Sequence, residues 1–577
     1  MTQPEPDQVK LSTVLSQEQI HQIRSVRSIV SNTGAGIVPD INAKKATNAE
    51  ELLAEIGYKQ ELNRTISGMG CFGIAFSIMG LLPSIITLMS VGLAGNGPVS
   101  LLWGWFISGF LILVLIGVPM AEMASALPTS GGLYYWTHYF APPSMKIQLS
   151  FFIGICNTFA LAGGVCSISY GFAKQVLSAV YISKDGDFEI TNGKIYGVLV
   201  GAIVFALLLC CLSSKNCSRL QATSIVANNL LVVIFFVALP IGTARTVGFN
   251  DAKFIFGEVE NLSSWTPGWA FFQFGFMTAC WTIGGFDSCV HMSEEVKNPS
   301  KNVPIGILGA ITSCWLLGFF ILIVINACIG PDIVAVLDTP SGQPLTQMFY
   351  NSLGKKWAIA FISLSAFCQF LMAASIVTAI SRQAWAFARD NGLPFSRYFK
   401  VVNKTLAVPL RSLFFVCALS AVIALLVLIG SEAANALFSI GIIGNYISWC
   451  TPQILRITSG RDIFRPGVFY LGKTLSNTLV IIGTAFQLFV IVICCMPDDT
   501  TVTPQTMNYS VVLNSGALAF AFLYYYLYKK GKYLGPKSNL TDEEYIDAVS
   551  VKDSELENVN IDSVMMEEKT ENKMSDE

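Results

Sequence analysis

The chain has 577 residues, of which 53% are hydrophobic and 13% are charged, and its mean hydropathy is +0.56. Soluble proteins of this length rarely have so apolar a composition, whereas apolar stretches of about 20 residues, long enough to cross a hydrocarbon core of about 30 Å, recur along most of the chain. The net charge of -2 provides no basic field for nucleic acid, which excludes that class of partner. We therefore expect a polytopic protein whose surroundings are the lipid bilayer.

Hydropathy divides the chain into three parts: a polar N-terminal tail at 1–65, a transmembrane domain at 66–530 and a polar C-terminal tail at 531–577. We expect the tails to be mostly disordered because they are rich in polar residues and poor in aromatic ones. Ubiquitin-dependent trafficking machinery is a partner that suits such tails. The transmembrane domain is predicted to contain twelve helices, at 70–92, 98–123, 147–181, 194–213, 219–243, 268–291, 303–330, 356–389, 408–430, 433–455, 475–497 and 508–529.

The distribution of Lys and Arg predicts the orientation of these helices. An even number of helices places both termini on one side of the membrane. The connections on that side hold most of the basic residues, and the one around the end of the eighth helix contains Arg389, Arg397, Lys400, Lys404 and Arg411. By the positive-inside rule, both termini are cytosolic. The predicted location is the vacuolar or the plasma membrane.

The sequence lacks the motifs of an enzyme or a metal protein. The 15 cysteines lie singly or in pairs within apolar stretches, without C-x-x-C spacing or histidine partners, so we interpret them as small buried side chains. There is no phosphate-binding loop and no nucleophile motif. We therefore predict no catalytic residue, no metal and no cofactor.

Two of the predicted helices contain helix-breaking residues near their centres. The first has Gly80 and Pro83, and the sixth has Gly284 and Gly285. Broken helices at these matched positions are typical of transporters built from two inverted repeats of five helices. Because Gly and Pro also occur in unbroken membrane helices, the interpretation depends on the pair rather than on either helix alone. Helices eleven and twelve would lie outside the repeat.

A pair of broken helices forms a site that suits a zwitterion. Each break frees backbone N–H groups on one side and carbonyl groups on the other, and the half-helix dipoles reinforce both. We expect the first helix to hold a carboxylate and the sixth to hold an ammonium group, and the aromatic faces of Trp281 and Phe286 could cover the cation. The alternative is that both rings face lipid or fill the core. The candidate substrate-binding residues are Ser77, Ile78, Met79, Gly80, Asn157, Trp281, Thr282, Ile283, Gly284, Gly285, Phe286 and Gln369.

Ionisable and amide side chains within apolar stretches are candidates for proton coupling or gating. Asp287 follows the Gly pair directly, and a carboxylate near the bilayer centre costs about 2.5 to 3.5 kcal/mol on insertion scales. Two interpretations of Asp287 remain open: a proton carrier or gate, and a structural carboxylate that caps the second half of the helix. Glu294 lies beyond the apolar stretch, where we expect it to meet a cytosolic Lys or Arg as a structural gate. For the other polar residues the alternative is an interhelical hydrogen bond. The candidates are Asp287, Glu122, Asn228, Glu294 and Arg382.

Three motifs resemble those of the amino acid, polyamine and organocation permeases. IGGFD followed by SEEVKNPSKNVP resembles the helix 6 signature of this superfamily, EMASALPTSGGLYYW resembles its segment after helix 2, and SRQAWAFARDNGLP resembles the end of its helix 8. Within the superfamily the chain is most similar to the fungal branch that carries 4-aminobutyrate (GABA), choline and related amines. The resemblance implies an all-α fold with ten core helices in two inverted repeats, two peripheral helices, and proton-coupled uptake of amines such as 4-aminobutyrate, 5-aminolevulinate and putrescine.

The resemblance places the gate aromatic of helix 6 at Trp281 and the acidic residue after the break at Asp287. The chain departs from the family pattern in helix 1, which has SIMGLLP in place of Gly-x-Gly, and in helix 5, which has Asn228 and Asn229 without a central Lys. Two alternative functions remain. One is a choline or polyamine permease, whose substrates lack a carboxylate. The other is an amine-sensing transceptor that signals through its tails.

Overall fold

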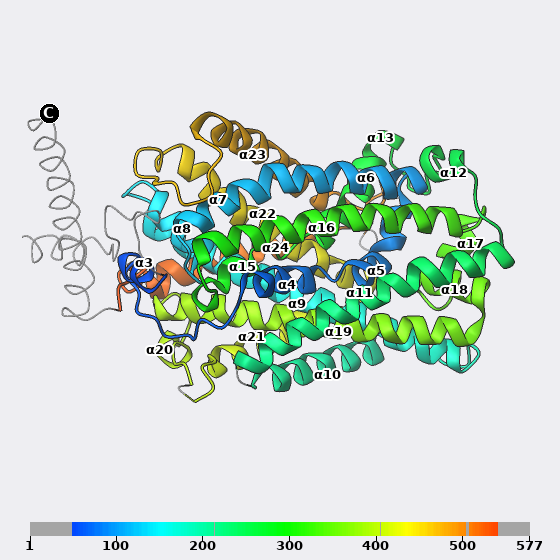
Figure 1. The fold of residues 1–577 in the computed structure, drawn as a ribbon, viewed down its shortest axis with the longest axis horizontal. Coiled ribbons are helices and arrows are strands. Elements are labelled where there is room, and N and C mark those ends of the chain that lie inside the picture. The colour runs from blue at the N-terminus through cyan, green and yellow to red at the C-terminus, as the bar shows by residue number, and fades with distance from the viewer. Residues whose placement is uncertain (1–48, 213, 404, 504–506, 540–577) are drawn as a thin grey trace, which may run out of the picture.

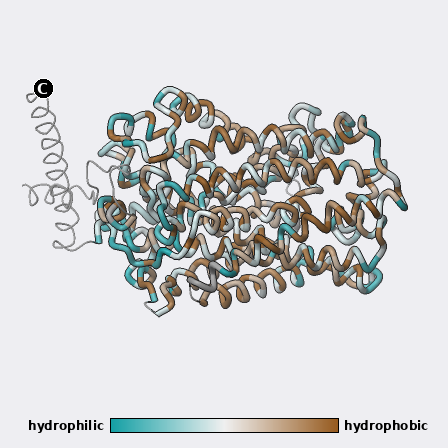
Figure 2. Tube along the Cα trace, viewed as in Figure 1, coloured by the Kyte–Doolittle hydropathy of each residue, from teal (hydrophilic) through white to brown (hydrophobic). Residues whose placement is uncertain are grey.

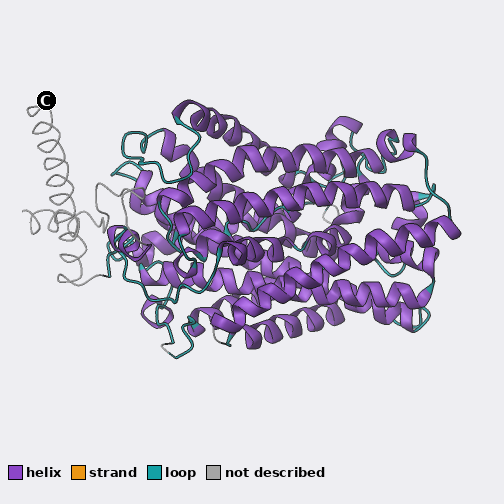
Figure 3. Cartoon of the chain, in the orientation of Figure 1, coloured by secondary structure: helices purple, strands orange, loops and turns teal. Residues whose placement is uncertain are grey.

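Long apolar helices run side by side between two polar ends of the molecule in the computed structural model (Figures 1 and 2). The structure describes residues 49–539 apart from 213, 404 and 504–506. Within these residues there is no β-strand (Figure 3), and only two isolated bridges occur, Ile66 with Val296 and Asn403 with Val408. The all-α class predicted from the sequence is confirmed for this part of the chain.

The α-helices are connected by short turns, and five segments labelled η have π-helical or 3₁₀ geometry. In chain order the elements are α3 (Ala49–Glu55), α4 (Gly68–Met79), α5 (Leu81–Ala94), α6 (Pro98–Leu111), η1 (Ile112–Gly117), α7 (Val118–Ala126), α8 (Gly132–Phe140), α9 (Lys146–Ser183), α10 (Asn192–Cys210), α11 (Ser214–Arg245), α12 (Ala252–Gly257), α13 (Pro267–Ala270), η2 (Phe271–Gly275), α14 (Phe276–Thr282), α15 (Ser288–His291), η3 (Ser293–Glu295), α16 (Pro299–Cys328), α17 (Ile333–Leu337), α18 (Pro344–Leu353), α19 (Lys355–Arg389), α20 (Ser396–Phe399), α21 (Leu410–Ile423), η4 (Ala424–Leu428), α22 (Ser431–Ile457), α23 (Lys473–Cys495), α24 (Ser510–Tyr524) and η5 (Tyr525–Lys529).

Ten helical stretches among the described residues are long and apolar enough to cross a membrane. Each coincides with a predicted helix to within a few residues. The two predicted helices that are not among the ten are the tenth, observed as the 27-residue α22, and the sixth, which is divided by the break after Thr282. The count of twelve and the inverted repeat therefore stay predictions.

The helices differ in how deeply they lie within the bundle. In α9 and α19, 83% and 72% of the most apolar stretch is buried inside the protein, against 17% in the stretch that contains α24. The two buried helices pack along one another, and α9 also packs along α22. The described cysteines are unbridged, and all except Cys211 and Cys495 are buried, as expected for small core side chains. Because the stretch that contains α4 and α5 is also 83% buried and packs against α19, the centre of the bundle is formed by α4, α5, α9 and α19.

The described parts of both tails lie at one end of the bundle, which we call the tail end; the opposite end is the far end (Figure 1). Most of the predicted tail sequence, residues 1–48 and 540–577, lies outside the described residues. The remainder of the N-terminal tail, 49–65, contains α3 and buries Leu52, Leu53 and Ile56. The α3 helix has a hydrophobic face, but with 7 residues it is too short to be predicted as a membrane helix from hydropathy.

Candidate functional site

The first break lies at Gly80, where the backbone turns between α4 and α5. Gly80 has φ 45° and ψ 58°, a left-handed conformation that glycine adopts at little cost. A Cβ atom at this position would lie 2.5 Å from Met372 Sδ of α19. Pro83 is the third residue of α5, a position where the missing N–H group removes no helical hydrogen bond. The same short segment therefore ends one helix and begins the next.

The N–H groups freed by this break are not those expected from the sequence. Ser77, Ile78 and Met79 are the last residues of α4, so their N–H groups bond within the helix, and the Gly80 N–H donates to the Phe76 carbonyl at 3.1 Å. The first N–H groups of a helix lack helical acceptors, and here these belong to Leu81 and Leu82. A carboxylate would therefore find free N–H groups at the start of α5 and not at residues 77–80, where the sequence predicted them.

The second break separates α14 from α15 and contains the Gly pair. Gly285 has φ 74°, and Ile283 ends α14 by donating its N–H to the Ala279 carbonyl at 2.8 Å. The Trp281 carbonyl accepts the Gly284 N–H at 3.2 Å, which leaves the neighbouring carbonyls of Cys280 and Thr282 without a helical donor. Free carbonyl groups therefore gather at the end of α14, as expected for the ammonium side of the site.

A cavity of about 40 Å³ lies between the two broken helices; Ile78 of α4 and Gly284 and Gly285 of the second break line it, whereas Gly80, Leu81 and Leu82 do not. A cavity needs about 10 to 15 Å³ for each water molecule, so this one holds a few waters and must widen for a larger ligand. Of the predicted substrate residues, only Ile78, Trp281, Gly284 and Gly285 line it. The other lining residues are Leu161, Gly164, Ile168, Cys280, Met372, Ile376, Gly441, Ile442, Asn445, Tyr446 and Trp449.

Helix α22 provides cavity residues that the sequence reasoning missed. Within the described residues, Asn445 Oδ1 and Trp449 Nε1 are buried and have no hydrogen-bond partner. Buried polar atoms are nearly always hydrogen-bonded, so unpaired ones beside a cavity indicate polar contacts for its contents. The available signal was the stretch GIIGNYISW, which places polar groups between small residues in an apolar helix.

An aromatic pair separates the central cavity from a second, larger cavity toward the far end. The Trp281 ring contacts the Phe438 ring at a centroid distance of 5.1 Å, and Trp281 Nε1 donates to Ser167 Oγ at 3.3 Å. Trp281 lines the central cavity, whereas Phe438 lines the larger one, which measures about 240 Å³ and which we call the vestibule. Tyr170 packs against Phe438 at 6.1 Å. The predicted gate aromatic thus lies between the two cavities.

Asp287 lies in a buried polar group beside the second break. Its Oδ2 atom is 3.5 Å from Asn157 Nδ2 and 3.6 Å from His291 Nε2, and its Oδ1 atom has no hydrogen-bond partner among the described residues. His291 Nδ1 lies 3.1 Å from the Ser130 carbonyl oxygen. Neither Asp287 nor Asn157 lines the central cavity. This arrangement suits either a carboxylate that exchanges a proton or one that holds a structural contact behind the second break.

Buried ion pairs close the bundle at the tail end. Arg389 of α19 binds Glu294 of η3 through two hydrogen bonds, Nη1 to Oε2 at 3.0 Å and Nη2 to Oε1 at 3.1 Å. The Ser130 N–H also donates to Glu294 Oε1 at 3.1 Å. Two helical turns away in α19, Arg382 Nε donates to Glu295 Oε1 at 2.8 Å. These pairs fasten the segment after the second break to α19.

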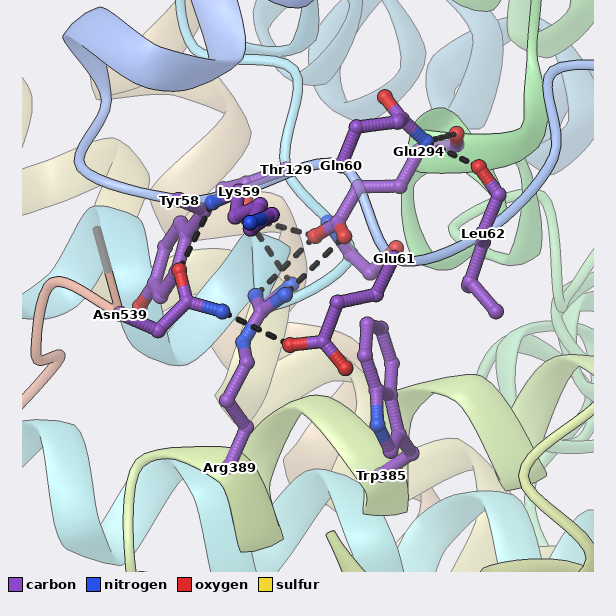
Figure 4. Close-up of polar contacts among 12 residues, drawn as sticks. Tyr58, Lys59, Gln60, Glu61, Leu62, Thr129, Glu294, Trp385, Arg389 and Asn539 are labelled. Carbon is purple, nitrogen blue, oxygen red and sulfur yellow. Dashed lines mark hydrogen bonds and ion pairs between the residues drawn. The ribbon is translucent and has the colours of Figure 1, made fainter. Parts of the chain in front are cut away.

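The described parts of the two tails lie over these ion pairs (Figure 4). Asn539 Oδ1 accepts the Lys59 N–H at 2.7 Å, and Asn539 Nδ2 donates to Glu61 Oε1 at 2.7 Å. The Arg389 guanidinium carbon lies 3.8 Å from the centre of the Tyr58 ring. We call this assembly of ion pairs and tail contacts the tail-end seal.

A buried carboxyl group adds to the seal. Tyr58 and Tyr134 donate their hydroxyl groups to Asp390 Oδ2 at 2.8 and 2.7 Å. Burial raises the pKa of Asp390 to about 6, although Arg389 and the two hydroxyl groups oppose the rise by stabilising the carboxylate. The charge of the seal therefore changes near that pH.

Three further predicted residues lie apart from the central cavity. Glu122 accepts a hydrogen bond from Arg456 Nη1 at 2.7 Å and one from the Leu471 N–H at 3.0 Å, so it joins α7 to α22 and to the start of α23. Asn228 Nδ2 donates to the Ser224 carbonyl at 2.9 Å within α11. Gln369 Nε2 donates to the Ile168 carbonyl at 3.1 Å. The contacts of Glu122 and Gln369 match the alternative of an interhelical hydrogen bond, whereas the hydrogen bond of Asn228 lies within its own helix.

Replacing Gly285 by alanine should lower transport at least tenfold. The new Cβ atom would lie 2.6 Å from Ile78 Cγ2 across the cavity, and alanine disfavours φ 74° by roughly 1 to 2 kcal/mol. The control is Gly516→Ala, where a Cβ atom meets nothing within 4 Å. The measurement is uptake normalised to the amount of folded protein. Normal uptake by Gly285→Ala would show that transport does not depend on the backbone conformation of the second break.

Comparison with known proteins agrees with this arrangement. A family model described as Amino acid permease matches residues 66–517. The "GABA-specific permease" of Saccharomyces cerevisiae is 54% identical over 91% of this chain and 92% of its own length. An uncharacterized amino-acid permease of Schizosaccharomyces pombe is 32% identical over 88% of this chain and 92% of its own, and "Amino-acid permease 2" of Neurospora crassa is 29% identical over 88% and 92%. The chain therefore belongs to the amino acid permease family and is a multi-pass membrane transporter, not an enzyme.

Proposed function

We propose that the protein is a proton-coupled secondary transporter for 4-aminobutyrate and related small amines such as 5-aminolevulinate and putrescine. The observation that carries the proposal is the pair of broken helices beside one cavity, with Ile78 of the first and the end of α14 and the Gly pair of the second lining it, and with N–H groups free of helical acceptors at the start of α5. Such a site suits a molecule with a carboxylate and an ammonium group. The 54% identity to a permease named for GABA supports the same substrate.

The proposed cycle uses the two closures described above. We infer that both tails are cytosolic, in the vacuolar or the plasma membrane, so that the tail-end seal is the cytosolic gate. The vestibule then admits substrate from the far side through Trp281 and Phe438. Release requires the aromatic pair to stay closed while Glu294 separates from Arg389. The proposed transmembrane domain has twelve helices, ten of them in two inverted repeats of five, and a bundle that contains the two broken helices rocks around the site. The proposed role of the tails is to recruit trafficking machinery.

Asp287 is the proposed site of proton coupling. Its contacts to Asn157 and His291 are long, at 3.5 and 3.6 Å, and it follows the carbonyl groups of the second break directly. Protonation of Asp287 changes the charge two residues from Gly285, which lines the central cavity. The other candidates, Glu122, Asn228, Glu294 and Arg382, are assigned structural or gating roles because they are engaged elsewhere.

Competition in one uptake assay tests the substrate class. Vesicles containing the protein should take up labelled 4-aminobutyrate when an inward proton gradient is imposed, and excess unlabelled 4-aminobutyrate should reduce this uptake more strongly than choline or putrescine. Stronger inhibition by choline or putrescine would favour a choline or polyamine permease. Tail-dependent signalling without net uptake would instead favour the transceptor.

A further inference from the structure

Lys174 is a basic residue near the far end of α9 that the proposed cycle does not use. It lines the vestibule and is half-buried. Each buried arginine of the tail end has a carboxylate within ion-pair distance, at Glu295, Glu294 and Glu122. Lys174, by contrast, has no ion pair and no hydrogen bond within the part of the chain that the structure describes. Its recorded contact is the Tyr170 ring, whose centroid is 5.9 Å from Nζ.

Placing a lysine ammonium group within a membrane protein without a carboxylate partner costs free energy, and ionisable residues in that position commonly contact a substrate or an ion. The vestibule around Lys174 has a volume of about 240 Å³, six times that of the central cavity, which provides space for a small solute. Hydroxyl and amide groups also line it, from Thr87, Ser90, Ser439 and Asn508. The vestibule thus combines a cation, hydrogen-bonding groups and enough space for a ligand.

The position of Lys174 relative to the aromatic pair sets the orientation of such a ligand. Tyr170 lies one helical turn from Lys174 and packs against Phe438, which in turn contacts Trp281. A zwitterion whose carboxylate binds Lys174 would direct its ammonium group toward these ring faces, which attract cations. The ammonium group would then approach the carbonyl groups at the end of α14 first.

We propose that Lys174 forms an outer binding subsite for the carboxylate of a zwitterionic amine and selects such substrates over purely cationic amines. The subsite rests on the proposed uptake of 4-aminobutyrate. Lys174 attracts the carboxylate and weakens the binding of choline and of putrescine at the entrance, so that these cations reach the central cavity less readily than 4-aminobutyrate does. Asp498 lines the same vestibule at its exposed rim.

Replacing Lys174 by methionine tests this subsite because the stem is kept and the charge is lost. We expect the KM for 4-aminobutyrate to rise about tenfold with the maximal rate within twofold, as for the loss of a charge-assisted hydrogen bond, and inhibition by putrescine to strengthen. Lys174→Arg should retain a KM within about threefold of wild type. Lys184→Met removes the same charge just beyond the end of α9, outside the vestibule, and should leave the KM unchanged.

Binding to purified protein provides a second measurement that does not depend on turnover. The affinity for 4-aminobutyrate should fall about tenfold in Lys174→Met, whereas the affinity for butylamine, which lacks the carboxylate, should not fall. An unchanged KM and an equal change in affinity for both ligands would overturn the subsite. Absence of 4-aminobutyrate uptake by the wild-type protein would refute the proposed function and the subsite together, whereas uptake with an unchanged KM in Lys174→Met refutes the subsite alone.

Discussion

Replacing Arg389 by alanine should lower the free energy of unfolding by about 3 to 5 kcal/mol, because the change leaves Glu294 buried without its charged partner. The guanidinium group also contacts the rings of Tyr58 and Trp385, at 3.8 and 4.6 Å from their centres, so packing is lost as well. Thermal unfolding of the purified protein in detergent measures the effect. The matched control is Arg397→Ala, which removes an exposed arginine at the same end and should change stability by less than about 0.5 kcal/mol.

A double-mutant cycle separates the ion pair from the other contacts of Arg389. Glu294→Gln with Arg389→Leu should destabilise the protein less than the sum of the two single changes, because no buried charge remains unpaired. Additive effects would mean that the two side chains contribute independently. That result would contradict the role of their pairing in the tail-end seal.

Replacing Asp287 by asparagine should lower proton-driven net uptake at least tenfold and lower substrate exchange at equal concentrations much less. Asparagine keeps the shape and a hydrogen bond to Asn157 but takes no part in proton transfer. Net uptake requires the unloaded transporter to return, which depends on releasing the proton, whereas exchange does not. Uptake and exchange are measured in the same vesicles.

The control for this experiment is Asn157→Ala. It removes the 3.5 Å contact to Asp287 and keeps the ionisable group, so net uptake and exchange should fall to a similar extent. An equal fall of both activities in Asp287→Asn would contradict proton coupling at this residue. It would instead support the structural cap, or a contact with the substrate.

Hydropathy predicted the long helices because the backbone N–H and C=O groups of an apolar stretch in lipid must hydrogen-bond within that stretch, which a helix achieves. The third helix, predicted at 147–181, is observed at Lys146–Ser183, and the eighth, predicted at 356–389, at Lys355–Arg389. The Gly pair predicted the second break, which begins after Thr282. Local sequence was sufficient for these features because helix formation and helix breaking depend on neighbouring residues.

The contacts between distant residues were beyond such reasoning. Glu294 was recognised as a gating candidate, but its partner Arg389 lies 95 positions away and was assigned only to the cytosolic loop. Asn445 and Lys174 were not predicted as site residues because the sequence does not show which face of a helix borders a cavity. The free N–H groups of the first helix were misplaced by a few residues, since the sequence does not specify at which residue α4 ends.

Concentrative uptake by the purified protein tests the central proposal most directly. In sealed liposomes with an acidic exterior, labelled 4-aminobutyrate should accumulate above its external concentration, and this accumulation should collapse when a protonophore removes the gradient. Gly285→Ala protein in matched liposomes should accumulate 4-aminobutyrate at least tenfold more slowly. Equilibration of 4-aminobutyrate without accumulation, or accumulation unaffected by the protonophore, would contradict proton-coupled transport through the site between the two helix breaks.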